Sequence, residues 1–458
     1  MAASPSSPAT AAGRREFAVS VVRRLQRAGY TAYWAGGCVR DLLRGEDPSD
    51  FDVATSATPE QVRSLFGQRH TLAVGASFGV ILVRGETSDS DVEVATFRTD
   101  GLYIDGRRPE SVQFATPEQD AQRRDFTING LFYDPLESRL YDYVGGQADL
   151  DRRLLRAIGD PVARFTEDKL RMLRAVRLSA RFEFELEEQT ALAVRQMASQ
   201  VVVVSAERIA QELRKMLLHR TRRIAIDRAD WLGLLHQVLP ELTEARAEIS
   251  AASSTQSPTP GSGPGDAWRQ TLDTLGALAQ PSFELAVAAL LEPLPQRWGR
   301  NAGGRKAEAV LRRLKLSNAE IEKTRWLLTQ VGAIDRLPNG PLWQWKELLG
   351  QPWIPELLTL ERGQRVSRGA SLDVVEACEE FLRQTPAGEL RPPPLVTGDD
   401  LIQRNFKPGK GFKELLRELY RAQLDGRLTR FEQFPELMPE LLARGSDASL
   451  GDLGELPP

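Results

Sequence analysis

Cysteine and histidine are scarce in this chain of 458 residues, which contains two cysteines and three histidines. Cys38 and Cys378 lie far apart, and neither belongs to a zinc-ligand spacing. We therefore expect no metal centre built from Cys and His. So few cysteines also fit a reducing compartment, and the sequence predicts a cytoplasmic protein.

Long hydrophobic runs are missing as well. No apolar run approaches the roughly 20 residues that a membrane-spanning helix needs, so we expect no membrane partner. Charge of one sign does not dominate either, because 60 basic and 63 acidic residues give a formal net charge of −3. This balance neither demands nor excludes a polyanionic partner. The N-terminus lacks the apolar core of a secretory signal, and we expect a disordered lead at residues 1–14.

What the sequence does contain is a change of pattern along its length. A helical pattern at residues 15–28 is followed by short β-rich runs, at residues 31–35, 51–55, 71–74, 80–84 and 91–97. Thr58, Pro59 and Gln61 predict the start of a helix between two of these runs. Helical periodicity dominates beyond about residue 149. The sequence therefore predicts an α+β fold, in which an N-terminal mixed-sheet head precedes an extended all-α neck, body and tail.

The domain boundaries follow these changes of pattern. We predict a head at residues 15–148, a helical neck at 149–220, a helical body at 221–335 and a helical tail at 336–458. A Ser/Thr/Pro/Gly-rich stretch at residues 250–265 has too little apolar material to pack. It predicts a flexible insertion within the body, to which the sequence assigns no function.

Two short motifs in the head have the composition of phosphate and metal sites. Gly36 and Gly37 follow a predicted strand and open a short helix, where backbone N–H groups can point at a phosphate, although such pairs more often mark only a turn. Asp50 and Asp52 lie two residues apart in a predicted strand, which places both carboxylates on one face. Hard oxygen ligands suit Mg²⁺, and two such ions can assist the transfer of a phosphoryl or nucleotidyl group.

A third carboxylate would complete this metal site. Asp91 and Glu93 lie on the polar face of another predicted strand, and the sequence does not choose between them. An isolated Asp-x-Asp is usually a solvated strand edge. The interpretation therefore depends on the motifs that surround these acids.

Taken in order, the motifs resemble those of a known family. The sequences GGCVRD at residues 36–41 and DFD at residues 50–52 are similar to motif A of the class II tRNA nucleotidyltransferase and bacterial poly(A) polymerase superfamily. RRDFTIN at residues 123–129 resembles its motif B, and EDKLR at residues 167–171 resembles its nucleotide-selecting motif D. The run SAERI at residues 205–209 is a weaker match to the motif that follows.

The resemblance implies a role for each matching residue. Asp50 and Asp52 would bind two Mg²⁺ ions, with Glu93 as an accessory acid. The incoming triphosphate would lie against four residues, Gly36, Gly37, Arg40 and Arg124.

The same resemblance implies how the base is selected. Asp168 and Arg171 lie three residues apart on a predicted helix, hence on one face, where they would select the base of CTP or ATP. A helix-surface ion pair is the commoner meaning of this spacing. Arg174 and Arg177 would bind phosphate or line an exposed helix.

The predicted activity is that of an enzyme, a nucleotidyltransferase that adds nucleotides from CTP and ATP to the 3′ end of tRNA and releases pyrophosphate. The run at residues 74–80 and the acidic terminus at 445–458 favour this over a bacterial poly(A) polymerase. The segment at residues 96–109 resembles the intact flexible loop of the family, which CC-only members shorten, so the resemblance argues against CC-only addition but leaves A-only addition open. Asp50 and Asp52 argue against a catalytically silent RNA-binding protein. The long helical part argues against a small-molecule nucleotidyltransferase.

RNA contact is expected from the helical body and tail. A basic face around Phe406 and Phe412 carries the candidate RNA-binding side chains Arg404, Lys407, Lys410, Lys413, Arg417 and Arg421. Such a face can meet phosphates without reading sequence. An ordinary amphipathic helix, with Glu414 and Glu418 cancelling part of the charge, explains the pattern equally well. We expect no DNA partner, and the oligomeric state stays open.

Overall fold

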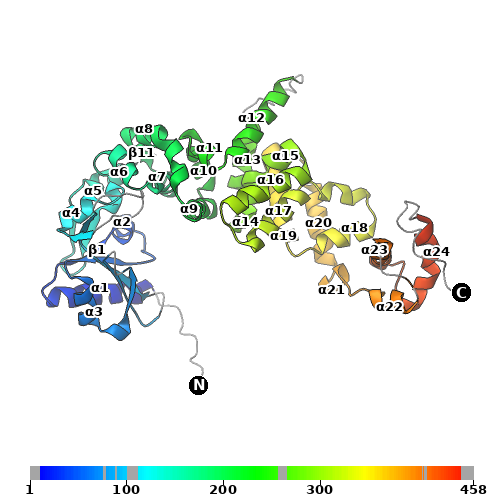
Figure 1. Cartoon of the computed structure of the whole chain (residues 1–458), viewed down its shortest axis with the longest axis horizontal. Helices are drawn as coiled ribbons and strands as arrows, with labels where there is room; N and C mark the ends of the chain where they lie inside the picture. The colour runs from blue at the N-terminus through cyan, green and yellow to red at the C-terminus, as the bar shows by residue number, and fades with distance from the viewer. Residues whose placement is uncertain are drawn as a thin grey trace. The chain divides into compact units, whose positions relative to one another are not determined.

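The computed structural model describes residues 11–75, 79–87, 90–100, 112–255, 266–404, 406 and 410–444. The chain divides into two compact units, the first comprising residues 1–243 with 313–315 and the second residues 244–312 with 316–458 (Figure 1). No helix within the described ranges is both long enough and apolar enough to cross a membrane. The finer division into head, neck, body and tail stays a prediction.

A seven-stranded mixed sheet organises the start of the first unit, in the order β3-β4-β5-β2-β1-β8-β9. Its strands are β1 (Ala32–Ala35), β2 (Asp52–Thr55), β3 (Thr71–Gly75), β4 (Val80–Val83), β5 (Val92–Thr96), β8 (Leu131–Asp134) and β9 (Arg139–Asp142). Strand β2 pairs parallel with β5 and antiparallel with β1. The five predicted strands are confirmed. The β8–β9 hairpin was not predicted.

One face of this sheet is covered by α1 (Ala11–Arg27) and α3 (Pro59–Phe66). Val21 and Leu25 of α1 and Val62 of α3 are buried in one apolar cluster with Trp34 and Val53 of the sheet. Side chains alternate along a strand, so Ala54 and Asp52 point to the opposite face from Val53. That opposite face therefore carries the carboxylate of Asp52.

The first residues of α3 and α1 can be compared with the helix starts that the sequence predicted. Thr58 caps α3 by accepting a hydrogen bond from the backbone N–H of Gln61, whose side chain returns to Thr58, and the predicted helix start is confirmed. Helix α1 begins at Ala11, so residues 11–14 are helical and the predicted disordered lead is wrong for them. Ala11 and Ala12 have the highest intrinsic helix propensity, which extends the helix backwards.

The remainder of the first unit is mainly helical. Its other helices are α2 (Gly37–Leu43), α4 (Pro117–Gln122), α5 (Gly146–Asp151), α6 (Pro161–Glu167), α7 (Leu170–Phe182), α8 (Glu188–Met197), α9 (Ala206–Leu218), α10 (Arg222–Trp231) and α11 (Leu234–Val238), with 3-10 turns η1 (Gln68–His70), η4 (Thr127–Asn129) and η5 (Ala198–Val203). A second small sheet pairs β6 (Arg98–Asp100) with β7 (Val112–Phe114). A short parallel ladder between β10 (Leu154–Leu155) and β11 (Glu185–Leu186) interrupts the part expected to be entirely helical.

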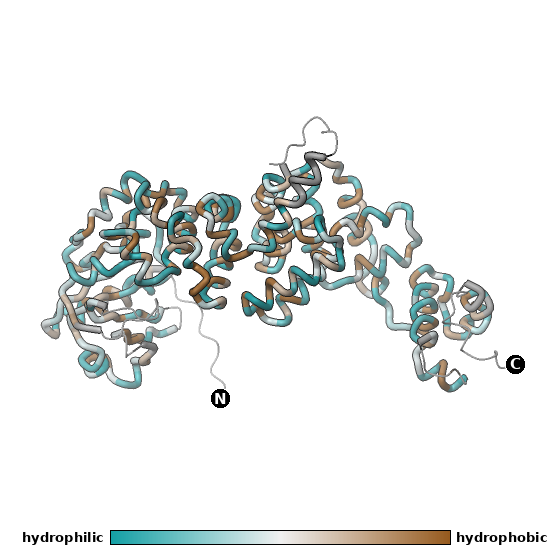
Figure 2. The backbone as a smooth tube through the Cα atoms, turned by 45° about the horizontal axis from the view of Figure 1, so that its top comes forward, coloured by the Kyte–Doolittle hydropathy of each residue, from teal (hydrophilic) through white to brown (hydrophobic). Residues whose placement is uncertain are grey.

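The second unit consists of helices throughout its described residues. They are α13 (Asp266–Ala277), α14 (Phe283–Leu291), α15 (Pro293–Trp298), α16 (Arg300–Arg313), α17 (Asn318–Gln330), α18 (Leu342–Leu349), α19 (Ile354–Arg368), α20 (Asp373–Gln384), α21 (Ala387–Leu390), α22 (Gly398–Gln403), α23 (Lys410–Leu424) and α24 (Phe434–Arg444), with η6 (Ile334–Asn339) and η7 (Phe431–Gln433). Hydrophobic and hydrophilic stretches alternate along the helices of both units (Figure 2). The predicted fold class, a mixed-sheet head followed by helices, is confirmed.

Helix α12 (Pro240–Thr255) links the two units in sequence. It continues to Thr255, so residues 250–255 of the predicted flexible insertion are helical, and residues 256–265 lie outside the described ranges. Alanines at positions 251 and 252 favour the helix despite the serines around them.

Candidate active site

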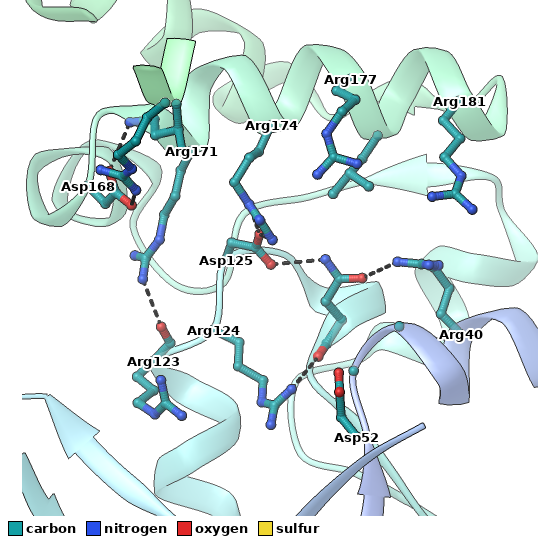
Figure 3. Close-up of a pocket in the computed structure, with 16 residues that line it drawn as sticks. Arg40, Asp52, Arg123, Arg124, Asp125, Asp168, Arg171, Arg174, Arg177 and Arg181 are labelled. Carbon is teal, nitrogen blue, oxygen red and sulfur yellow. Dashed lines mark hydrogen bonds and ion pairs between the residues drawn. The ribbon is translucent and has the colours of Figure 1, made fainter. Parts of the chain in front are cut away.

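The polar face of the head and the helices that follow it enclose a cavity of about 470 Å³ (Figure 3). This volume lies within the range of about 300–1,000 Å³ that small-molecule sites occupy. Its charged lining consists of eight arginines and three aspartates, namely Arg40, Arg123, Arg124, Arg171, Arg174, Arg177, Arg181 and Arg208 with Asp52, Asp125 and Asp168. Such an excess of guanidinium groups suits a polyanion such as a triphosphate.

Asp52 lies at the end of β2 that faces this cavity. Burial there, with repulsion from Glu93 and Asp50, raises the pKa of Asp52 to about 6, although Arg124 acts in the opposite direction. Two further acidic side chains therefore act on Asp52 at this point.

The structure distinguishes among the acids that accompany Asp52. Glu93 pairs directly with Asp52 across the parallel β2–β5 ladder, so both side chains lie on one face. The carboxylate of Asp91 instead accepts a hydrogen bond from the backbone N–H of Gly85 at 3.0 Å. Asp50 lies before β2, which begins at Asp52, so the argument from strand alternation fails for Asp50. Neither Asp50 nor Glu93 lines the cavity itself.

Gly36 occupies a position that no other residue fits. Its φ of 73° lies in the left-handed region, and a Cβ there would lie 2.9 Å from Nη1 of Arg124. The glycine therefore lets Arg124 approach the turn between β1 and α2. Gly36 and Gly37 both line the cavity, as the sequence predicted.

Arg123 and Arg124 are held by a carboxylate that the sequence analysis missed. Asp120 of α4 is almost completely buried and forms ion pairs with Arg123 at 2.7 Å and with Arg124 at 2.9 Å. Burial alone would raise the pKa of Asp120, but the two guanidinium groups outweigh it and lower that pKa. The sequence did contain a signal for these pairs, because Arg123 and Arg124 follow Asp120 by three and four residues, and such spacings bring side chains together on a helix.

A chain of hydrogen bonds connects the head with α7 through motif B. Arg40 Nη1 donates to Asn129 Oδ1 at 2.7 Å, and Asn129 Nδ2 donates to Asp125 Oδ1 at 3.0 Å. Arg174 of α7 then donates to Asp125 Oδ2 at 2.8 Å through Nε. Arg40 also pairs with Asp41 at 2.7 Å. Arg40 and Arg174 both belong to this network and both line the cavity (Figure 3), and the phosphate contacts predicted for them stay predictions.

The buried pair of Asp125 and Arg174 gives a prediction for stability. We expect Asp125→Asn to lower the free energy of unfolding by about 2 kcal/mol at neutral pH, below the ~3–5 kcal/mol of a fully buried pair because Arg174 is about one-third exposed. Urea denaturation followed by circular dichroism measures the loss. Asp151→Asn, an exposed aspartate on α5, is the matched control and should change stability by less than about 0.5 kcal/mol. Equal losses in the two variants would contradict the assignment.

The same pair fixes the sign of the pH dependence. Burial would raise the pKa of Asp125, but Arg174 and the hydrogen bond from Asn129 lower it to about 2. Because this lies below the unfolded value of about 3.9, the pair stabilises the fold above that pH and loses its effect as the pH falls toward 2. The difference between wild type and Asp125→Asn should therefore shrink over that interval.

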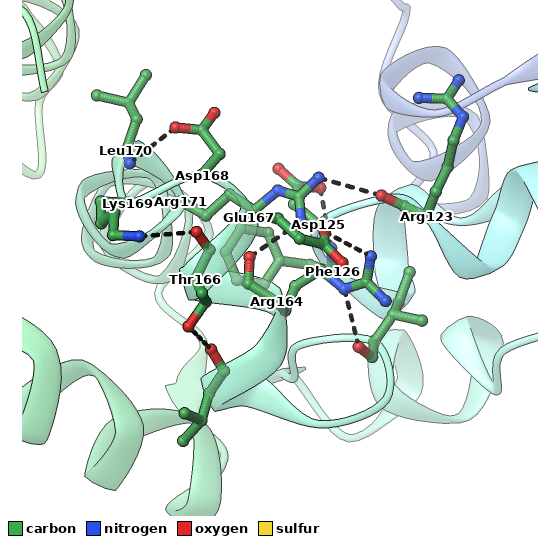
Figure 4. Close-up of polar contacts among 12 residues, drawn as sticks. Arg123, Asp125, Phe126, Arg164, Thr166, Glu167, Asp168, Lys169, Leu170 and Arg171 are labelled. Carbon is green, nitrogen blue, oxygen red and sulfur yellow. Dashed lines mark hydrogen bonds and ion pairs between the residues drawn. The ribbon is translucent and has the colours of Figure 1, made fainter. Parts of the chain in front are cut away.

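Asp168 does not lie on the helix that was predicted for it. Helix α6 ends at Glu167 and α7 begins at Leu170, and Asp168 between them has extended backbone angles. Its Oδ1 accepts a hydrogen bond from the backbone N–H of Leu170 at 3.0 Å, an interaction through which aspartate competes with helix continuation (Figure 4). The predicted helix that would carry both Asp168 and Arg171 is therefore wrong at Asp168.

The two residues expected to select the base are held by different partners. Arg208 of α9 donates to both carboxylate oxygens of Asp168, at 2.7 Å and 3.2 Å. Arg171 donates to Glu167 at 2.6 Å and to the backbone carbonyl of Arg123 at 3.1 Å (Figure 4). They do not form the helix-surface ion pair considered above, yet both line the cavity.

Three further arginines extend in a row along α7 toward the cavity (Figure 3). Arg174 is paired with Asp125, and Arg177 donates to the buried Glu212 at 2.6 Å. Arg181 has no carboxylate partner among the described residues and was not predicted as a site residue. Its guanidinium lies over the ring of Phe182, 5.3 Å from the centroid.

The predicted RNA-binding residues lie in the second unit, apart from this cavity. Lys413 and Arg417 are exposed on α23, and Arg404 is exposed with its guanidinium 4.6 Å from the ring centroid of Phe434. Phe406 and Phe412 are buried in the local apolar core, so they do not belong to an RNA-facing surface. Lys407 lies outside the described residues, as does the side chain of Lys410.

Comparison with known proteins assigns the family. Residues 32–156 match the Poly A polymerase head domain, and residues 183–246 match the family described as a probable RNA and SrmB-binding site of polymerase A. The head is therefore that of a nucleotidyltransferase. The chain is 45% identical over 415 residues to a CCA-adding enzyme of Geobacillus kaustophilus, covering 89% of this chain and 92% of that protein. A CCA-adding enzyme of another Geobacillus species is 31% identical over 91% of this chain and 94% of its own length.

Solved structures agree with this assignment. The Bacillus stearothermophilus CCA-adding enzyme in complex with CTP superposes with a TM-score of 0.70 at 28% identity, covering 95% of this chain and 99% of that one. A CCA-adding enzyme in complex with ATP shares the fold, with a TM-score of 0.62 at 20% identity over 94% and 95% of the two chains. The chain belongs to the CCA-adding enzymes of the class II tRNA nucleotidyltransferase and poly(A) polymerase superfamily.

Proposed function

We propose that this chain builds or repairs the 3′-terminal CCA of tRNA, adding nucleotides from CTP and ATP without a nucleic-acid template and releasing pyrophosphate. The observation that carries the proposal is the single cavity that combines Asp52 with eight arginines and with both Asp168 and Arg171. One end has Asp52, on which Asp50 and Glu93 act, and the other has donors and acceptors that can read a base. Relatives that span almost the whole chain are CCA-adding enzymes.

The metal requirement follows from the acids of the head. Among the described residues no three Cys, His, Asp or Glu side chains form a ready-made metal cluster. Mg²⁺ rarely uses such a cluster, since one or two carboxylates, waters and substrate phosphates usually complete its coordination. Asp50 and Asp52, with Glu93 beside them, fit that pattern and would hold two ions. Bound there, Mg²⁺ would neutralise charge on the attacking and leaving oxygens.

The protein groups would position the reactants. Arg124, fixed by Asp120, and the free guanidinium of Arg181 lie where they can neutralise the triphosphate, and Gly36 allows close approach of the backbone. The RNA 3′-hydroxyl would attack the α-phosphate, and pyrophosphate would leave toward the arginine-lined side. Positioning and electrostatic stabilisation would supply most of the rate enhancement.

Base selection would use donor and acceptor groups that form hydrogen bonds with other protein groups when no nucleotide is bound. A cytosine or adenine amino group can donate to the carboxylate of Asp168, and Arg171 can donate to ring acceptors. An incoming base would share or replace the contact between Asp168 and Arg208. Arg208 is thus a positioning residue for the base-reading carboxylate.

The product pattern on defined acceptors tests this function. The purified chain receives tRNAs that end at the discriminator base, after the first C and after the second C, with CTP and ATP singly and together. We expect all three tRNAs to be completed to CCA. Growth of only the CC-ended tRNA, by a single A, would instead identify the A-adding half of a divided system. Long A tails on unrelated RNA would identify a poly(A) polymerase.

A further inference from the structure

The second unit contains two adjoining cavities that no site described above uses. One, of about 810 Å³, lies between α16 and α17 and reaches Trp353 at the start of α19. The other, of about 440 Å³, lies against η6 and α18. They share Arg300, Trp326 and Gln330, so together they form one continuous groove across these helices.

Three tryptophans give the groove its aromatic character. Trp326 and Trp353 meet edge to face, with ring centroids 5.5 Å apart and planes inclined at 66°. Trp343 lines the other end, and all three are only partly buried. These rings line the groove and are not enclosed by the core, so they offer aromatic surface to a ligand.

Most charged side chains of the groove are paired, but two of its cationic side chains have no acidic partner among the described residues. Glu308 is neutralised by Arg312 at 2.8 Å and Arg325 at 3.4 Å. Glu347 contacts Arg421 at 3.5 Å. Glu322 is the third acid of the lining.

Arg300 and Arg336 also line the groove, and within the described residues neither forms an ion pair or a side-chain hydrogen bond. Two guanidinium groups without partners face one unpaired carboxylate, so the open charge of the groove is positive.

The groove continues toward the basic helix of the tail. Arg421 of α23 stacks on Trp343, with its guanidinium 3.9 Å from the ring centroid, and exposed Lys413 and Arg417 precede it on the same helix. Amide side chains supply donors and acceptors along the groove, among them Asn301, Asn318, Gln330 and Gln344.

We propose that this groove, defined by Arg300, Trp326, Arg336, Trp343 and Trp353, binds unpaired nucleotides of RNA, with bases against the tryptophans and phosphates against the two arginines. Partly exposed aromatic rings interspersed with cations are the arrangement by which proteins bind single-stranded nucleic acid. Open positive charge favours a polyanion over an apolar protein segment, and three tryptophan rings flanked by amide side chains favour stacked bases over an acidic segment. The identity of the RNA as tRNA rests on the proposed function; binding to the groove does not.

A binding measurement on the full chain tests the groove directly. The probe is a labelled oligouridylate of about 12 nucleotides, within the span of known single-strand sites, with a 3′-phosphate that prevents extension. Fluorescence anisotropy at several salt concentrations gives both the affinity and its salt dependence. The variants are Arg300→Gln with Arg336→Gln, and separately Trp343→Ala. Arg269→Gln, an exposed arginine of α13 outside the groove, is the matched control.

We expect the double arginine variant to bind about tenfold more weakly and to lose about 1.4 from the slope of log affinity against log salt, about 0.7 for each phosphate contact. Trp343→Ala should weaken binding about fivefold or more. Arg269→Gln should match wild type. Unchanged affinity and slope in the folded double variant would overturn the proposal, even if Trp343→Ala proved unstable.

Nucleotide addition to tRNA is measured on the same proteins to separate the two proposals. A wild-type chain that binds the oligonucleotide through the groove but never extends tRNA would contradict only the proposed function. A chain that extends tRNA normally, with oligonucleotide binding insensitive to the groove substitutions, would contradict only the groove. Binding of the same sequence as DNA with equal affinity would show that the groove does not use the ribose hydroxyl and would leave its contacts with base and phosphate standing.

Discussion

Asp52→Asn should reduce nucleotide transfer by about 10³-fold or more, because the change removes several kcal/mol of charge stabilisation at the reacting phosphate. The amide keeps the shape of the side chain but not its charge, so it is a poor ligand for Mg²⁺. Asp52 is also the acid on which Glu93 and Asp50 both act. Single-turnover incorporation of labelled CTP measures the loss, and binding of tRNA by anisotropy should stay within about twofold of wild type.

The matched control for this experiment is Asp91→Asn. Asp91 is an acid of the same strand region, but its carboxylate is engaged with Gly85 and does not face Asp52. It should therefore retain most of the activity, whereas Glu93→Gln should lose more. Transfer at the wild-type rate in Asp52→Asn would refute the metal site. A large loss in Asp91→Asn with none in Glu93→Gln would transfer the accessory role to Asp91.

Asp168→Ala should damage the choice of nucleotide more than the chemistry. A bidentate contact that reads a base is worth about 1–3 kcal/mol, so we expect discrimination of CTP and ATP against UTP and GTP to fall by about 10- to 100-fold. The relevant quantity is kcat/KM for each nucleotide on a tRNA with a defined end. Because Asp168 lies between α6 and α7 and touches no acid of the head, kcat should fall less than discrimination does.

Arg208→Gln distinguishes base reading from simple loss of structure. It removes the partner that orients Asp168 but leaves the carboxylate in place. We expect KM for both nucleotides to rise while most of the discrimination remains. The alternative outcome is that Asp168→Ala and Arg208→Gln change kcat/KM identically for all four nucleotides. The pair would then serve only to hold α9 against the α6–α7 junction, and the proposed base-reading role of Asp168 would be refuted.

Local signals in the sequence predicted the elements of the head well. The strands that flank Asp52 are short runs rich in apolar residues, and the cap of α3 is encoded within four consecutive residues. The set of cavity residues was also largely predictable, because the motifs at residues 36–41, 123–129 and 167–171 supply most of its lining. In each of these cases short-range information is sufficient.

Partners distant in the sequence were not predictable in the same way. The ion pair of Asp168 with Arg208 joins residues forty positions apart, and the contact of Arg40 with Asn129 spans eighty-nine positions. A spacing of three residues suggested that Asp168 and Arg171 share a helix, but the hydrogen bond from Leu170 to Asp168 breaks the helix between them. Phe406 and Phe412 were placed on a surface because their neighbours are basic, whereas the fold buries both.

The hydrogen-bonded connection from Arg40 through Asn129 and Asp125 to Arg174 has a consequence for protein engineering. It ties α7, the helix that carries the proposed base-reading Arg171, to the turn that begins α2, so under the proposed function selection and chemistry share one hydrogen-bonded frame. A chimera that exchanged only residues 160–182 with a relative of different specificity would receive the new base-reading groups, but the hydrogen-bond partners that support them would still be those of this chain. We therefore expect a successful graft to include residues 123–129 as well. Motif B would then contribute to specificity without having to touch the base.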